Sequence, residues 1–110
     1  MELSSDIWVY ALLRRVNLAG AYATIVRKGD ARAGAVLVKT IDRRTDEAAV
    51  YAEAVRADGQ SVWMQPLASR VEADIDAYIA RAVLIDPDLW VVEVEDPDGR
   101  RFLTEHVDAR

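Results

Sequence analysis

The sequence predicts an α+β domain in which two helices pack on a mostly antiparallel sheet of about six strands. Apolar residues recur at helical spacing in two segments, residues 5–19 and 71–83. Short runs of strand-forming residues, separated by turn residues, lie between and after them. The expected order is therefore helix, four strands, helix, two strands. A chain of 110 residues is long enough for one such domain, expected to span residues 1–110.

The first helix is predicted to begin at Ser5 or Asp6, because both residues are good N-caps. Gly20 marks its end, since glycine is preferred just past the last helical residue. Trp8 fits the apolar face only loosely, so we expect it to be partly exposed. The apolar positions that follow the helical period are Val9, Leu12, Leu13, Val16 and Ala19.

The next four strands are predicted at residues 21–27, 35–41, 49–55 and 61–67. The second of these, AVLVKTI, is apolar on both faces, which indicates a central strand. The KGDARAG segment before it is expected to be a hairpin loop. Asp58-Gly59 predicts a tight hairpin between the third and fourth strands. Pro66 lies near the end of the fourth strand, which indicates either that this strand is at a sheet edge or that the strand stops there.

The second helix has the clearest sequence signals. Ser69 and Glu72 match the S-x-x-E capping box that starts many helices. Asp86-Pro87 ends the helix, because the residue before proline avoids the α conformation. Its apolar positions at helical spacing are Val71, Ile75, Tyr78, Ile79, Ala82 and Val83.

The last two strands are predicted to form a hairpin around the DPDG turn of residues 96–99. Its first strand runs over residues 89–95, and its second returns from Arg101 to about His106. Trp90, Val92 and Val94 share the face that is turned to the core. The cross-strand pairs expected from this turn are Val94 with Phe102, Glu95 with Arg101 and Glu93 with Leu103.

Composition excludes several classes of function. The net charge is −5 and the pI is near 4.8, which argues against nucleic-acid binding and against anionic membrane surfaces. The chain has no cysteine, which removes disulfides, thiol nucleophiles and thiolate metal sites. No apolar run approaches the roughly 20 residues of a membrane span, and the first residues lack the order of a signal peptide. A soluble cytoplasmic protein is therefore expected.

Three stretches resemble a known family. They are RKGDARAGAVLVK, VWMQ and, most specifically, DAYIARAVLIDPDLWVVEVEDPDGRRFL. They resemble the domain of unknown function 1491 family, which consists of small bacterial proteins found mainly in alphaproteobacteria. The resemblance covers nearly the whole chain and implies a small bacterial protein. It implies no activity and assigns no catalytic or binding residue.

The residues offer little for catalysis. Residues 86–98 carry six carboxylates, but their spacing does not match a calcium-binding loop. Glu93 and Glu95 lie roughly 7 Å apart on one strand, as two acid/base carboxylates could, although a solvated sheet face is favoured. His106 is the single histidine, and no nucleophile elbow or phosphate-binding glycine loop accompanies it. No metal and no cofactor are therefore expected, and a non-enzymatic role is favoured over an enzymatic one.

Two features suggest binding instead. Arg14-Arg15 and Arg43-Arg44 are expected near the same end of the sheet, where four guanidinium groups could hold a phosphate or an acidic partner. Trp63 precedes a methionine on a strand expected at an edge, and exposed aromatic side chains favour a protein interface. A core position for Trp63 is the open alternative.

We therefore predict a non-enzymatic protein-interaction domain, with an unknown protein or a second copy as partner. Self-association would use an edge strand or a helix face. The alternative is a small-ligand or phosphate-binding domain that uses the arginine cluster, and a weak hydrolase that uses the carboxylates comes third.

Overall fold

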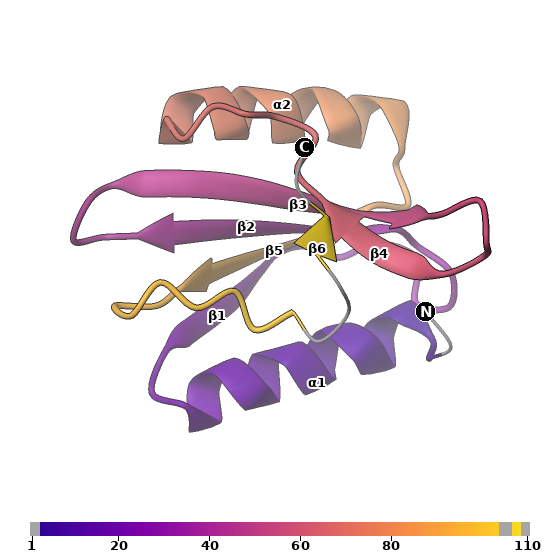
Figure 1. The fold of residues 1–110 in the computed structure, drawn as a ribbon. Coiled ribbons are helices and arrows are strands. Elements are labelled where there is room, and N and C mark those ends of the chain that lie inside the picture. Colours follow the sequence, from indigo (N-terminus) through magenta and orange to yellow (C-terminus); the bar gives the residue numbers. More distant parts are fainter. Residues whose placement is uncertain (1–2, 104–106, 109–110) are drawn as a thin grey trace.

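The computed structural model describes residues 3–103 and 107–108 and has three layers, with one sheet between two helices (Figure 1). The predicted order of the two helices and the first five strands is confirmed, whereas the sixth strand is Val107–Asp108 and not the strand predicted from Arg101 to about His106. No helix in the described part of the chain is long and apolar enough to cross a membrane. The elements are α1 (Ser5–Leu18), β1 (Tyr22–Arg27), β2 (Val36–Asp42), β3 (Glu47–Val55), β4 (Ser61–Met64), α2 (Glu72–Ile85), β5 (Trp90–Glu95) and β6 (Val107–Asp108).

The sheet is mixed, which corrects the expectation of a mostly antiparallel one. Its strand order is β1-β5-β2-β3-β4-β6. The pairs β1–β5, β2–β3 and β3–β4 are antiparallel, whereas β2–β5 and β4–β6 are parallel. The chain leaves β4, passes through α2 over one face of the sheet, and inserts β5 between β1 and β2. This crossover makes β5 a central strand with a neighbour on each side.

The predicted C-terminal hairpin is wrong, although its turn forms. The Gly99 N–H donates to the Asp96 carbonyl at 3.0 Å, and Gly99 has a positive φ of 72°. Residues 101–103 are not a strand, because β1 and β2 already occupy both sides of β5. Val94 is aligned with Ala23 and Thr40 and not with Phe102. The predicted end of the returning strand, at residues 104–106, lies outside the described residues.

The predicted helix ends and turns are confirmed, but the predicted N-caps of both helices are wrong. Helix α1 begins at Ser5 and ends before Gly20, whose φ is 83°, and its N-cap is Ser4 and not Ser5 or Asp6. Asp58-Gly59 joins β3 to β4, and α2 ends before Asp86-Pro87. The capping box does not form, because the N-cap of α2 is Val71. The Ser69 hydroxyl instead accepts a hydrogen bond at 3.1 Å from the N–H of Val71, which lies before the first helical residue.

The two faces of the sheet carry separate cores. Helix α1 packs on one face, where Trp90, Val92 and Val94 are buried as predicted. Helix α2 packs on the other face against buried side chains of β2, β3 and β5. Trp8 and Trp63 pack against each other on the α1 face, with ring centroids 5.2 Å apart. Both are buried, so the expected partial exposure of Trp8 and the edge-exposed position of Trp63 are wrong.

The KGDARAG segment is not a hairpin loop, because it spans across β5 from β1 to β2. It holds the start of β5 through hydrogen bonds. The Trp90 indole N–H donates to the Asp30 carbonyl at 2.7 Å, and the Asp30 N–H donates to the Asp88 carbonyl at 2.9 Å. A Cβ added at Gly29 or Gly34 would collide with the Asp88 carbonyl oxygen. Two of the three stretches that carry the family resemblance, RKGDARAGAVLVK and the one that contains DPDLWVVEVED, therefore pack against each other.

Candidate functional site

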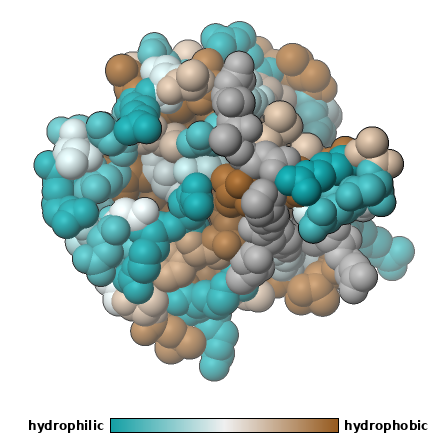
Figure 2. Space-filling model, in the orientation of Figure 1, coloured by the Kyte–Doolittle hydropathy of each residue, from teal (hydrophilic) through white to brown (hydrophobic). Residues whose placement is uncertain are grey.

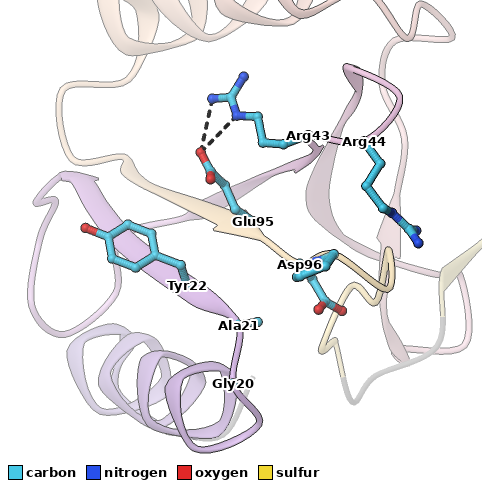
Figure 3. Close-up of a pocket in the computed structure, with 8 residues that line it drawn as sticks. Gly20, Ala21, Tyr22, Arg43, Arg44, Glu95 and Asp96 are labelled. Carbon is cyan, nitrogen blue, oxygen red and sulfur yellow. Dashed lines mark hydrogen bonds and ion pairs between the residues drawn. The ribbon is translucent and has the colours of Figure 1, made fainter.

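Arg43 and Arg44 lie in the turn between β2 and β3 and line a cavity of about 520 Å³ (Figure 3). The cavity sits at the end of the sheet where α1 ends and β1 begins, which is the end predicted for the arginine cluster. Its other lining residues are Gly20, Ala21, Tyr22, Glu95, Asp96 and Pro97.

Both arginines of this cavity already contact carboxylates. The Arg43 Nε and Nη2 atoms donate to Glu95 Oε1 at 3.2 and 3.0 Å, and Arg43 Nη1 donates to Glu72 Oε1 at 3.1 Å. Arg44 pairs with Asp42 at 3.3 Å. Figure 3 shows the two side chains pointing in different directions, with Arg43 toward Glu95. A bound phosphate would therefore compete with carboxylates for both guanidinium groups.

The other three predicted binding residues lie elsewhere. Arg15 donates to the Phe102 carbonyl at 3.0 Å, and Arg14 is exposed on α1. Neither of them lines the cavity that holds Arg43 and Arg44. Trp63 is 1% exposed, so its side chain is a core residue and is not available to a partner.

The strongest electrostatic feature of the described residues is a buried lysine that sequence reasoning missed. The Lys39 side chain is 7% exposed, and its Nζ lies 2.7 Å from Glu72, 2.8 Å from Asp76 and 3.1 Å from Glu93. Lys39 comes from β2, Glu93 from β5, and the other two acids from α2. We call these four residues the Lys39 cluster. The signal in the sequence was a lone cation inside a strand that is apolar on both faces.

The charges of the Lys39 cluster stabilise one another. Burial alone lowers the pKa of Lys39, but hydrogen bonds to Asp76, Glu72 and Glu93 outweigh burial and raise that pKa above its ordinary value. Lys39 also holds the pKa of Glu72 below its ordinary value, with a smaller contribution from Arg43. An amine that stays protonated is a poor nucleophile. The ion pairs of the cluster join the first two turns of α2 to β2 and β5.

The two glutamates that were considered as an acid/base pair are both ion-paired. Glu93 contacts Lys39, and Glu95 contacts Arg43. The expected cross-strand partner of Glu95, Arg101, instead lies with its guanidinium carbon 5.6 Å from the centre of the Tyr51 ring. Residues 3–103 and 107–108 contain no group of three or more histidines and carboxylates arranged to hold a metal ion. His106 lies outside the described residues.

A second buried charge fixes the turn after β5. The Asp96 side chain is 1% exposed and contacts Arg100 Nε at 2.7 Å. It also accepts hydrogen bonds from the Arg100 and Asp98 N–H groups at 2.8 and 3.3 Å. The Arg100 hydrogen bond is the main reason why the pKa of Asp96 falls to about 2. Arg100 also donates to the Ala19 carbonyl at 3.3 Å, so this pair joins the turn to the end of α1.

A stripe of apolar residues runs along the surface of α2 that faces away from the sheet, flanked by the exposed charged residues Asp74, Asp76 and Arg81. Ala73, Ala77, Ala80 and Leu84 recur along it at spacings of four, three and four residues, and all are exposed. Leu84 is 86% exposed, and its neighbour Ile85 is 84% exposed. We call these five residues the α2 outer face. In Figure 2, hydrophobic side chains reach the surface at the top of the molecule, where α2 lies, with hydrophilic side chains between them.

An apolar groove continues from this face toward the sheet. It has a volume of about 390 Å³ and lies beside the C-terminal half of α2. Sequence reasoning assigned α2 only its buried side. The available signal was the segment AYIARAVLI, residues 77–85, which has one charged residue and is apolar nearly all round. The groove is lined by Leu37, Tyr78, Arg81, Ala82, Ile85, Asp86 and Leu89.

Comparisons with known proteins agree with this architecture. A family model described as "Protein of unknown function (DUF1491)" matches residues 3–104. A crystal structure of a DUF1491 family protein from Caulobacter crescentus CB15 is 63% identical, with a TM-score of 0.94 over 96% of this chain and 99% of that one. An NMR structure of a DUF1491 family protein from the same organism gives a TM-score of 0.91 at 63% identity, over 98% of each chain.

A more distant relative has the same fold. The solution structure of protein Atu0922 from A. tumefaciens is 31% identical, with a TM-score of 0.81 over 98% of each chain. No curated protein matches the sequence. The resemblance inferred from the RKGDARAG and DPDLWVVEVED stretches is confirmed, and the chain belongs to the DUF1491 family.

Proposed function

We propose that this protein is a non-enzymatic protein-interaction domain and that the α2 outer face is its docking site. The observation that carries the proposal is the exposure of Leu84 and Ile85, 86% and 84%, in the C-terminal half of α2, where Arg81 is the one charged residue of residues 77–85. A helix that is apolar on all sides is normally buried. Contiguous exposed apolar surface on a soluble protein commonly marks an interaction site.

Helix α1 is a useful contrast because it also exposes apolar side chains. Ile7, Tyr10 and Leu18 are exposed on it. Polar residues are interspersed among them, including Asp6 and Arg14. Scattered apolar residues of this kind are ordinary on protein surfaces. The uninterrupted stripe of the α2 outer face is what favours α2 over α1 as the docking site.

The absence of cysteine from the sequence allows a direct test in cells. Leu84→Cys introduces a single thiol on the α2 outer face, and Leu18→Cys is the matched control at a leucine that is 75% exposed on α1. Maleimide labelling of each variant is measured in intact cells and in dilute purified protein. We expect position 84 to label several-fold more slowly in cells than in dilute solution, and position 18 to label similarly in both. If the labelling rate in cells, divided by the rate in dilute solution, is the same at both positions, the α2 outer face is not a docking site.

The alternative function is a small-ligand or phosphate-binding domain, and one observation favours it. The cavity of about 520 Å³ is lined by two of the four predicted arginines, Arg43 and Arg44. Guanidinium groups match phosphate geometry, although here they would exchange carboxylate partners for the ligand. Arg14 and Arg15 do not line this cavity, so the ligand would be held by Arg43 and Arg44.

Calorimetric titration with inorganic phosphate and with ATP separates the two functions. The alternative predicts saturable binding that Arg44→Gln weakens and Lys28→Gln, at an exposed loop position, leaves unchanged. No heat of binding at millimolar ligand would leave the interaction domain as the function.

A further inference from the structure

We infer that the partner seated on the α2 outer face is a second copy of this chain, packed through an antiparallel pair of α2 helices about a two-fold axis. The inference rests on the proposed docking function and names its partner. In a two-fold interface the same patch must complement itself. Shape and charge on α2 both meet that requirement.

The shape of the stripe is self-complementary. When two α2 helices run antiparallel, Leu84 at one end of the stripe lies opposite Ala73 of the other copy. Ala77 then lies opposite Ala80. In an antiparallel pair, each step forward along one helix is a step back along the other, so the residue numbers of all facing pairs have the same sum. The exposed leucine of each copy thus packs over the smallest side chain of the other, twice per dimer. Alanines in the middle let the two helix backbones approach closely.

The charges beside the stripe are also self-complementary. Asp74, in the first turn of α2, and Arg81, near its end, lie on the same flank of the stripe at helical positions seven residues apart. A two-fold axis perpendicular to the helices brings that flank of one copy against the same flank of the other. In the register that places Leu84 opposite Ala73, Arg81 of one copy then lies two residues, about 3 Å along the helix, from the position opposite Asp74 of the other copy, an offset that the long arginine side chain spans. Asp74 accepts one hydrogen bond from Ser69 at 2.6 Å and keeps further lone pairs for the second contact.

Sedimentation equilibrium of the full chain between about 1 µM and 1 mM tests the dimer, since this range spans the affinities of weak homodimers. We expect a reversible monomer–dimer equilibrium. Leu84→Lys should raise the dimer Kd about 100-fold or more, because each dimer loses two buried leucines. The matched control Leu18→Lys, on the opposite side of the molecule, should leave the Kd unchanged.

A charge exchange tests the register. Arg81→Asp alone places two aspartates opposite each other at both ends of the interface, and Asp74→Arg alone places two arginines there. Each single variant should raise the dimer Kd about 10-fold. An equimolar mixture of the two variants restores both opposite-charge pairs, so it should form a heterodimer with close to the original Kd. Circular dichroism confirms that each variant remains folded.

The outcomes separate the inference from the function on which it rests. A wild-type chain that is monomeric up to 1 mM, or a dimer that Leu84→Lys does not weaken, overturns the inference of a second copy. A dimer that the mixture of charge variants fails to restore overturns the antiparallel register. Protection of position 84 in cells with a monomeric purified chain would keep the docking function and assign it a different protein partner.

Discussion

Replacement of Lys39 by methionine removes the cation at the centre of the Lys39 cluster and keeps its apolar stem. Three carboxylates then face one another without the ammonium group that joins them, at positions now 2.7, 2.8 and 3.1 Å from its nitrogen. The side chain is 7% exposed, so water cannot simply take its place. We expect the variant to fold and to be clearly less stable.

The structure sets the size of the effect. Removal of one partner from a buried ion pair costs about 3–5 kcal/mol. The loss here falls at the low end, about 3 kcal/mol, for two reasons. Asp76 is 56% exposed and can be solvated where it is, and Glu72 keeps its contact with Arg43 at 3.1 Å. A loss of this size is a large fraction of the roughly 5–15 kcal/mol by which a domain is stable.

The loss should depend on pH. Lys39 lowers the pKa of Glu72 below its ordinary value of 4.5, so this contribution to the free energy of unfolding is fully present above pH 4.5. It is lost as the pH falls through the lower pKa of the folded state. The raised pKa of Lys39 matters at alkaline pH. Its contribution to the free energy of unfolding is fully present below pH 10.5 and is lost only at higher pH. The difference between wild type and variant should therefore hold at pH 7 and shrink below pH 4.5.

Urea unfolding followed by tryptophan fluorescence measures this difference at pH 7 and near pH 3.5. The control is Lys28→Met, which changes the chain's other lysine at an exposed loop position. If Lys39→Met and Lys28→Met lose the same stability at pH 7, the cluster does not fasten α2 to the sheet. A difference that stays constant between the two pH values would refute the electrostatic explanation.

Three further changes test other parts of the fold. Asp96→Asn should lower the free energy of unfolding by about 1–3 kcal/mol at pH 7, because Arg100 loses the nearer of its two carboxylate partners, and wild type and variant should converge as the pH falls toward the pKa of about 2. Gly34→Ala should destabilise the protein by more than 1 kcal/mol, since the new Cβ collides with the Asp88 carbonyl, and thermal unfolding measures the change. Trp63→Phe should cost about 1–3 kcal/mol and abolish the near-ultraviolet circular dichroism band of the Trp8–Trp63 pair, whose centroids are 5.2 Å apart. Retention of that band in the variant would contradict the packing of the two rings.

Local patterns predicted the helices and most of the strands because the signals for them are themselves local. The period of Val9, Leu12 and Val16 follows from burial of one helix side, and all three are buried. Gly20 and Gly59 both adopt the positive φ that their turns require. The prediction that Trp90, Val92 and Val94 share one face was also confirmed. Successive side chains point to opposite faces in any strand, whichever strands lie beside it.

Strand neighbours could not be predicted from turns alone. The DPDG turn formed, yet β5 pairs with β1 and β2 because its first residues are apolar on both faces. Val91 and Val92 are both buried, one on each side of the sheet. The same two-sided pattern correctly marked β2 as central, and it would have marked β5 as central too. Two-sided burial was therefore a better guide to strand order than the turn.

The candidate site was predicted only in part, because charge contacts depend on which elements meet. The expected meeting of Arg43-Arg44 with the end of α1 and the start of β1 is present in the cavity lining. Lys39 meets Glu72 and Asp76 only because α2 crosses over β2, and no local pattern contains that crossing. Exposure of Leu84 is likewise a property of the folded molecule, although the near absence of charge in residues 77–85 pointed to it.

Photo-crosslinking in cells tests most directly whether the α2 outer face is a docking site. A photoreactive amino acid is placed at position 84 and, as the control, at position 18, the leucine that is 75% exposed on α1. We predict a discrete crosslinked product from position 84 and none above background from position 18. Crosslinking that is diffuse and equal at the two positions would contradict the account.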